Sequence, residues 1–524
     1  MTKHGRYVLC IGFFAALGTF FYGYDTGVTA TTIGHASFIQ YMNNPSHELI
    51  GSIGAAYTAG QAIGSLLQIA IGDRLGRIRF MTLLTTLVTI GSIIQTASTS
   101  IGMFVGGRAL AGLGMGGMTL TVALYLSEIA PAHSRGLIGG LSGTGLLLGI
   151  VISYWTGYAC SQAPYGQLQW RLPVALQIPW SVLFLCGLLT FMPETPRQLV
   201  KMGQIDRARA VFARLHQGRH EDDNEADHEF KLMHAQISFE TSREITNIKE
   251  IFRLHYKRAI VAMTIGIATA TAGAEVIGYF QVVLYASLGI DANTRLILVA
   301  VNGTIGFISV ALSNRFLMDR WGRRNLLLAG MGGSILIQTY CAIMQWNFQD
   351  SDNEVGKGFA IFGIYLHTIC HSAAFAGAAS LYGAEVLPIA LRSKMMGVAG
   401  FAHFSVAVGL IEAAPRALAT IRQNYYYVFV GCTLCFLIFG YYYYPETKNK
   451  TLEEIAAAFG DKVVDVGEYQ GGMEHVLVAE HLPAEKIGSV DGGDVEVKPQ
   501  RESKRWSNSK RWSRQQIIGL GSGM

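Results

Sequence analysis

The sequence predicts an all-α membrane protein with twelve transmembrane helices arranged as two related six-helix bundles. Apolar stretches of about 20 residues recur along the chain, and this is the length that crosses a bilayer core of about 30 Å. Half of the 524 residues are hydrophobic and only 15% are charged, whereas soluble domains carry about 25% charge. Three motifs also occur twice at a spacing of about 250 residues, as expected for a duplicated bundle.

The repeated motifs occupy matching places in the two halves. They are GDRLGR at 72–77 with MDRWGRR at 318–324, SEIAP and Arg135 at 127–135 with AEVLP and Arg392 at 384–392, and PET at 193–195 with PET at 445–447. Three pairs at nearly one spacing argue against coincidence. The first half is therefore expected to repeat as the second half.

Twelve apolar segments have the length of a membrane span. They are expected at residues 7–27, 50–71, 81–98, 102–126, 137–158, 172–192, 259–285, 296–317, 326–346, 358–384, 396–414 and 426–444. The first segment follows Lys3 and Arg6, as in a secretory signal, but it is long enough to span and carries Gly23-Tyr24-Asp25 near its end. We expect it to remain as a helix.

These segments divide the chain into four regions. Residues 1–192 are expected to form the N-terminal bundle and residues 259–445 the C-terminal bundle. Residues 193–258 carry amphipathic stretches and an acidic run, which predict a cytoplasmic linker with short helices. Residues 446–524 form a polar, mostly disordered cytoplasmic tail. Its final Lys-Arg-Trp clusters alternate with serines, a pattern that can also rest on an anionic leaflet.

Basic residues fix the orientation of the bundle. They gather at the N-terminus and in loops of one parity: Lys3, Arg6, Arg74, Arg77, Arg79, Arg135, Arg320, Arg323, Arg324, Arg392 and Lys394. The positive-inside rule makes that side cytoplasmic. Both termini are then cytoplasmic.

Several function classes have no support in the sequence. Six of the seven cysteines lie in spans, so no disulfide framework is expected. Walker motifs, metal-ligand clusters and nucleophile elbows are missing from the sequence, so neither an enzyme nor a cofactor or metal is expected. The loops and tail account for the net charge of +5, so nothing predicts a nucleic-acid partner. The bilayer is the expected environment, and no oligomer is required.

The motifs resemble those of the sugar porters of the major facilitator superfamily, and more loosely those of the fungal members. The matching residues are Gly23-Tyr24-Asp25, Gly107-Arg108, Tyr125, the motifs at 128–136 and 193–197, Asp319 to Arg324, and the motifs at 445–448 and 451–455. The resemblance covers about residues 20 to 460. It implies the major facilitator fold and transport by alternating access, with a substrate site between the halves.

The resemblance assigns charged residues at the cytoplasmic ends of the spans to an inner gate. They are Arg77, Glu128, Arg135 and Glu194 in the first half, and Arg323, Glu385 and Arg392 in the second. Carboxylate and guanidinium groups form charge-assisted hydrogen bonds, and at a wet mouth each pair contributes about 1 kcal/mol or less. Such pairs can hold a gate closed and still break. The alternative is that these charges only set the topology, which explains the arginines but not the intercalated glutamates.

Asp25 and Arg108 are charged residues within predicted spans. At about 1.5 Å per residue, Asp25 lies about 25 Å along its outward-running helix, and Arg108 about 10 Å inside the outer end of its own. Charged groups in spans usually pair with one another. Proton-coupled sugar porters carry an acid and an arginine at the matching positions, so the resemblance implies proton coupling. A structural ion pair is the alternative.

The expected sugar site departs from the family pattern. Where the family places amides or Trp, this chain has Gly143, Ala274-Glu275, Phe280, Ser380 and His403, while Asn302 remains. Because each sugar hydroxyl both donates and accepts, a pocket that lacks amides discriminates poorly for polyols.

Ionisable and aromatic residues replace these amides. The expected substrate-binding residues are Glu275, Tyr279, Tyr285, Asn302 and His403. His367 and His371 are weaker candidates, because a histidine within a span is often a packing group. This set suits a substrate with an apolar or aromatic body and a few polar groups.

Three functions remain open. The first is proton-coupled import of a sugar or sugar-like molecule across the plasma membrane. The second is import or export of a non-sugar metabolite, such as an organic acid or aromatic compound. The third is a nutrient sensor, which only the long tail favours.

Overall fold

The computed structural model describes residues 3–129, 135–216, 248–387 and 392–448, together with residues 230, 231, 233, 234, 237 and 459. All regular elements in these ranges are helices, which confirms the all-α prediction. The described helices belong to one compact unit of residues 1–462. The acidic run at 220–225 and the tail beyond residue 459 lie outside the described residues, so the expectations for them remain predictions.

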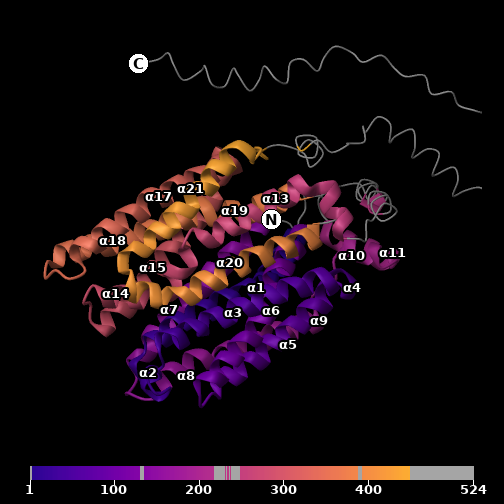
Figure 1. The fold of residues 1–524 in the computed structure, drawn as a ribbon. Helices are drawn as coiled ribbons and strands as arrows, with labels where there is room; N and C mark the ends of the chain where they lie inside the picture. Colours follow the sequence, from indigo (N-terminus) through magenta and orange to yellow (C-terminus); the bar gives the residue numbers. More distant parts are fainter. Residues whose placement is uncertain are drawn as a thin grey trace, which may run out of the picture. The chain divides into compact units, whose positions relative to one another are not determined.

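The N-terminal half is built from long helices joined by short ones (Figure 1). The long helices are α1 (Lys3–Gly34), α3 (His47–Leu67), α5 (Arg77–Thr96), α6 (Ile101–Ile129), α7 (Arg135–Ser161) and the consecutive pair α8 (Leu168–Ala175) and α9 (Gln177–Thr190). The short elements are α2 (Ala36–Tyr41), the π-helical turn η1 (Gln68–Gly72) and α4 (Asp73–Leu75). Two further helices, α10 (Pro196–Lys201) and α11 (Ile205–His216), follow α9.

The C-terminal half repeats this plan. Its long elements are α13 (Ile248–Thr271) with α14 (Ala274–Ser287), α15 (Ala292–Leu312), α17 (Arg323–Phe348), α18 (Glu354–Cys370) with η4 (His371–Ala376) and α19 (Gly377–Val386), α20 (Arg392–Thr420), and α21 (Tyr425–Tyr443). Its short elements are η3 (Ser313–Leu317), α16 (Met318–Trp321) and η6 (Arg422–Asn424). The order of a π-helical turn and a short helix after α15 matches the order after α3.

Within the described residues, eleven helical segments are long and apolar enough to cross a membrane. The twelfth expected span, 50–71, corresponds to α3 and η1. With 21 residues, α3 is about 31 Å long, so length is not what sets it apart. Its buried face carries Thr58, Gln61 and Ser65, and these polar residues make the helix less apolar. They are buried because this helix packs against α6 and α20.

Glycines let α3 and α6 approach closely. A Cβ atom added at Gly60 or Gly64 would overlap the backbone of α6, and one added at Gly112 or Gly116 would overlap the backbone of α3. Small residues four positions apart are the usual way in which membrane helices pack at short distance. The close packing places Arg108 of α6 beside Tyr57 of α3.

The two halves contact each other through matched helices. Helix α3 packs against α20, and α7 packs against α15; Figure 1 shows the indigo and violet helices of the first half beside the magenta and orange helices of the second. In each half the same turn reverses the chain, because Gly76 (φ 86°) and Gly322 (φ 85°) adopt the left-handed region that favours glycine. The structure therefore shows the duplication that the repeated motifs predicted.

The seventh span is broken in its middle. Gly273 has φ 79° and lies between α13 and α14, directly before the first residue of α14. Glu275 lies in the first turn of α14. A helix N-terminus carries partial positive charge, so an acid is stabilised there. This break explains how the bundle accommodates a carboxyl at mid-span.

Candidate functional site

Asp25 of α1 and Arg108 of α6 form an ion pair inside the bundle. The Nη1 atom of Arg108 donates to Oδ1 of Asp25 at 2.5 Å and to the Asp25 carbonyl oxygen at 3.2 Å. The two side chains are 1% and 0% exposed. The structure thus brings together the two residues that the sequence analysis paired, and neither faces lipid.

Only some of the polar atoms of the Asp25–Arg108 pair have hydrogen-bond partners. The guanidinium carbon of Arg108 lies 3.9 Å from the centre of the Tyr57 ring, a cation–π contact that partly replaces solvation of the charge. Among the described residues, Oδ2 of Asp25 and Nε and Nη2 of Arg108 have no hydrogen-bond partner.

Glu275 and His403 form a second polar pair, between α14 and α20. The Nε2 atom of His403 lies 2.9 Å from Oε1 of Glu275, and its Nδ1 atom lies 2.8 Å from the carbonyl oxygen of Gly266 in α13. The His403 and Glu275 side chains remain 14% and 25% exposed. Two of the expected substrate-binding residues thus bond to each other and keep part of their surface accessible.

The other expected substrate-binding residues lie in the core. Tyr279 and Tyr285 are 4% and 0% exposed, and Asn302 is 1% exposed. The hydroxyl of Tyr285 and Oδ1 of Asn302 have no hydrogen-bond partner among the described residues, so both keep an unused polar atom. Tyr285 packs with Tyr154 in an apolar cluster and not with the Glu275–His403 pair.

Open space lies where the family carries an amide in the fifth span. A Cβ atom added at Gly139 or Gly143 of α7 would meet no other atom within 4 Å, and the same holds for Gly278 of α14. Phe280, which replaces a family Asn, is 1% exposed and packs in the core. Ser380 lies in α19, but its side chain lies outside the described residues.

His367 has a structural role and is not open to a substrate. The Gln338 Nε2 group donates to the Ala272 carbonyl oxygen at 2.5 Å and lies 3.0 Å from Nε2 of His367. These bonds tie α17 and α18 to the end of α13, next to the break at Gly273. The His371 ring lies 6.1 Å from the His367 ring.

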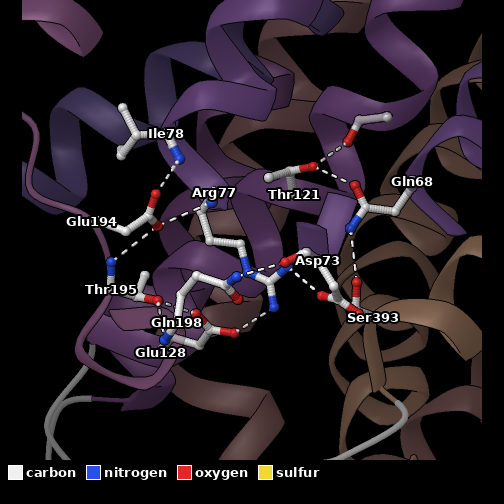
Figure 2. A network of polar contacts seen from close by, with 11 residues as sticks. Gln68, Asp73, Arg77, Ile78, Thr121, Glu128, Glu194, Thr195, Gln198 and Ser393 are labelled. Carbon is white, nitrogen blue, oxygen red and sulfur yellow. Dashed lines mark hydrogen bonds and ion pairs between the residues drawn. The ribbon is translucent and has the colours of Figure 1, made fainter. Parts of the chain in front are cut away.

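At the end of the bundle that is predicted to be cytoplasmic, Arg77 is held by two carboxylates (Figure 2). Its Nη1 donates to Oδ1 of Asp73 at 2.6 Å, and its Nη2 donates to Oε1 of Glu128 at 3.1 Å. The Thr195 hydroxyl donates to the other oxygen of Glu128 at 2.6 Å. Burial acts to raise the pKa of Asp73, but the Arg77 guanidinium outweighs it and lowers that pKa below its ordinary value.

Glu194 caps the start of α5. Its carboxylate accepts backbone N–H bonds from Arg77, Ile78 and Thr195 at 3.0, 3.1 and 3.2 Å, as Figure 2 shows. Burial raises the pKa of this carboxyl. Unpaired N–H groups at a helix start donate hydrogen bonds to an anion, so the PET motif holds the loop after α9 against α5.

The C-terminal half builds the same cap with Glu446. Its Oε1 accepts backbone N–H bonds from Arg323, Thr447 and Lys448, each at 3.0 Å. The hydroxyl of Tyr382 donates to the Pro445 carbonyl oxygen at 2.6 Å. In the first half, the hydroxyl of Tyr125 donates to the Pro193 carbonyl oxygen at 2.8 Å.

The charged pairs of the expected gate do not cross between the halves where the structure describes them. Arg77 and Glu128 belong to α5 and α6 of one half, so their bond braces that half. A contact that does cross is the bond from Gln68 Nε2 to the Ser393 hydroxyl at 3.0 Å (Figure 2). Gln68 is held in turn by the Thr121 hydroxyl, which donates to its Oε1 at 2.6 Å.

Three further residues of the expected gate are Arg135, Glu385 and Arg392. Arg135 begins α7 and Glu385 lies in α19, but both side chains lie outside the described residues. The Nη2 atom of Arg392, at the start of α20, lies 3.5 Å from the Leu387 carbonyl oxygen.

Sequence reasoning missed several residues of this network. Glu446 could have been found from the repeated PET motif, since it corresponds to Glu194. Asp73 lies in the repeated GDRLGR motif, four residues before Arg77, which is the spacing of a helical ion pair. Gln68 and Ser393 carry no comparable signal, because polar residues of this kind are common in spans.

The described residues include no group of three or more His, Cys, Asp or Glu side chains placed to hold a metal ion. Polar side-chain pairs lie within the predicted spans of each half, Asp25–Arg108 in the first and Glu275–His403 in the second.

Comparisons with known proteins match the chain over most of its length. A family model described as sugar (and other) transporter matches residues 11–459. The low-affinity glucose transporter HXT1 of Saccharomyces cerevisiae is 28% identical over 472 residues, covering 86% of this chain and 81% of that protein. The MFS-type transporter criB of Aspergillus cristatus is 30% identical over 462 residues, covering 87% and 94%.

Solved structures share the fold. The proton:xylose symporter XylE bound to 6-bromo-6-deoxy-D-glucose superposes with a TM-score of 0.75 at 20% identity, covering 87% of this chain and 100% of that chain. The xylose transporter XylE from E. coli in a partially occluded inward-open conformation gives a TM-score of 0.71 at 19% identity, with 85% and 100% covered. These matches confirm the predicted two-bundle architecture.

Proposed function

The chain belongs to the family of sugar (and other) transporters and has the fold of the major facilitator superfamily, and from this premise we propose that it imports a sugar or sugar-like small molecule together with protons. It is a membrane transporter and not an enzyme. The observation that carries the proposal is the buried Asp25–Arg108 pair, in which one carboxyl oxygen has no partner among the described residues.

The Asp25–Arg108 pair suits proton coupling for a physical reason. A carboxyl out of water favours its protonated form, while a cation beside it favours the ionised form. A movement of α1 relative to α6 would change the balance between these two effects. Asp25 would then release its proton when Arg108 is close and take up a proton when Arg108 withdraws.

Transport by such a fold requires the two halves to rock about a site between them. The braces at the cytoplasmic end support this, because Arg77, Glu128 and Glu194 hold the N-terminal half together while it moves. Polar contacts between the halves, such as Gln68–Ser393, are single hydrogen bonds of about 1 kcal/mol. A bond of this strength can break when the cytoplasmic side opens.

A sugar is favoured by the relatives. The glucose transporter HXT1 of yeast covers most of this chain, and proteins of this kind reside in a membrane. We place the protein in the plasma membrane. Both termini are cytoplasmic in this proposal, because the basic residues gather in the loops of that side.

A non-sugar metabolite is the second candidate, and the Glu275–His403 pair favours it. This pair occupies positions where the family carries amides, and it presents a charged or proton-sharing surface instead. Such a surface suits an organic acid or an aromatic compound with titratable groups better than a polyol. In that case the direction of transport is open to export as well as import.

Uptake into vesicles separates these candidates. Purified protein in proteoliposomes would be given radiolabelled D-glucose, D-xylose or quinate, with and without an inward proton gradient. Accumulation of glucose or xylose driven by the gradient supports the main proposal, and accumulation of quinate alone supports the second. A thermal-shift screen across the same compounds checks binding, because a ligand of the folded state raises its apparent stability.

A further inference from the structure

The hydrogen-bond partners of His403 restrict its protonation state. Its Nδ1 atom lies 2.8 Å from the Gly266 carbonyl oxygen, and a carbonyl oxygen can only accept. Nδ1 therefore carries a hydrogen. This leaves Nε2 as the atom whose protonation is free to change.

The contact between His403 and Glu275 needs one further proton. At 2.9 Å, a bare Nε2 and an ionised carboxylate oxygen would both present lone pairs to each other, which is repulsive. Either Nε2 carries the proton, giving an imidazolium beside a carboxylate, or Oε1 carries it and donates to a neutral imidazole. The pair as a unit holds one exchangeable proton between two residues of different helices.

The position of Glu275 at the start of a helix suits an acidic side chain. Glu275 lies in the first turn of α14, where the partial positive charge of the helix N-terminus stabilises a carboxylate. The side chain of Glu275 also keeps a quarter of its surface accessible.

The other titratable groups around the pair are few and come from neighbouring helices. Tyr22 of α1 and Tyr279 of α14 both lie within electrostatic range of Glu275, and Asp25 lies within range of both tyrosines. Arg108 of α6 acts on Tyr279, and Tyr57 of α3 lies beside that arginine. Between Arg258 and its end at Thr271, α13 has no titratable residue, and on α20 the nearest ones to His403 are Lys394 and Glu412.

We propose that Glu275 and His403 together form a proton-binding site in the C-terminal half, separate from Asp25, that joins α14 to α20 while it holds its proton. Loss of the proton to water leaves a bare Nε2 facing a carboxylate, and their repulsion separates the two helices at this point. Gain of the proton restores the bond. The proposal goes beyond the coupling role of Asp25 and does not depend on the identity of the substrate.

The protonation of His403 can be followed directly in the full-length protein. Protein labelled with ¹⁵N-histidine and reconstituted in lipid nanodiscs would be titrated by NMR, with His403 identified by the signal lost in His403→Gln. In the wild type, Nδ1 should stay protonated throughout, and Nε2 should change in a single step between about pH 5 and 8.

The Glu275→Gln variant provides the matched test. Its amide N–H₂ group can donate to a bare Nε2, so His403 should stay neutral and the step should disappear from this range. His367→Gln is the control, because His367 bonds to Gln338 and the step of His403 should persist without it. The proposal is wrong if His403 keeps one protonation state across the range in the wild type, or if it titrates identically in Glu275→Gln. Neither NMR titration measures transport. If the proposed transport function proved wrong, the titration results would still stand.

Discussion

Oδ1 of Asp25 and Nη1 of Arg108 lie 2.5 Å apart, and both side chains are almost completely buried. The carboxylate of Asp25 and the guanidinium of Arg108 therefore neutralise each other. Either charge alone would be strongly disfavoured in the membrane interior. Because other polar atoms of both side chains lack partners among the described residues, the pair is held mainly by this bond, the bond to the Asp25 carbonyl and the Tyr57 ring. A change at either residue should have consequences for folding as well as for transport.

Removal of the Asp25 side chain should destabilise the protein. Asp25→Ala leaves the buried guanidinium of Arg108 without its carboxylate, at a cost of about 3–5 kcal/mol. Asp25→Asn should cost less, because the amide oxygen still accepts from Nη1. Thermal unfolding in detergent measures the difference, and equal losses in the two variants would contradict the assigned bond.

The two left-handed glycines should be equally sensitive to substitution. In Gly76→Ala and Gly322→Ala, the new Cβ atom would lie 2.7 Å from a carboxylate oxygen of Glu194 or Glu446, and the backbone conformation is itself unfavourable for Ala by about 1–3 kcal/mol. Both variants should lower the unfolding temperature. Gly102→Ala is the control, since its Cβ atom meets nothing within 4 Å and should be neutral or stabilising. A tolerated alanine at either left-handed position would refute the repeated turn.

The Asp73–Arg77 bond should make the protein sensitive to acid. Because the pKa of Asp73 is lowered in the folded state, its contribution is fully present above the ordinary aspartate pKa of about 3.9 and is lost as the pH falls below that value. Asp73→Asn should lower stability at neutral pH by about 1–2 kcal/mol and should weaken the dependence on acid. Unfolding temperatures between about pH 7 and 3 test this.

Asp350→Asn is the matched control for the acid test. Its carboxylate bonds to Arg422 at 2.8 Å, but the two side chains are 78% and 53% exposed, and exposed pairs contribute little. This variant should follow the wild type at every pH. If Asp73→Asn and Asp350→Asn behave alike, the burial of the Asp73–Arg77 pair has no effect on the free energy of unfolding.

The fold could be predicted from the sequence for two reasons. The bilayer thickness sets the length of the apolar stretches, and the duplication repeats the motifs at one spacing. The sequence also placed Asp25 opposite Arg108, since both are charged residues in the outer half of their spans. It placed Arg77 and Glu128 in the first half but did not show that they bond to each other. It also did not find the Gln68–Ser393 contact, because pairing between helices depends on their rotation and tilt, and sequence spacing does not fix either. The burial of Tyr285 could not be predicted for the same reason.

Restoring amides near the open space beside Gly143 should improve hexose transport. Gly143→Gln adds a side chain where no atom lies within 4 Å of its Cβ, and Glu275→Gln replaces a charge by a group that both donates and accepts. One added hydrogen bond to a sugar hydroxyl, at about 1.4 kcal/mol, corresponds to about a tenfold gain in affinity. Competition of radiolabelled D-glucose binding measures it.

Phe280→Asn completes the family pattern but should behave differently. Phe280 is a buried core residue, so the change removes packing and should cost about 3–5 kcal/mol. No gain in glucose affinity from Gly143→Gln with Glu275→Gln would contradict the expectation that the missing amides weaken sugar recognition.

Proton-driven uptake in proteoliposomes tests the central claim most directly. With wild-type protein and a labelled substrate selected by the binding screen, an inward proton gradient should drive accumulation above the external concentration. In Asp25→Asn, exchange of labelled for unlabelled substrate should persist, because it needs no net proton movement, while accumulation should be lost. Accumulation by Asp25→Asn at the wild-type level, or wild-type uptake that does not change when the gradient is collapsed, would contradict the assignment of Asp25 as the coupling acid.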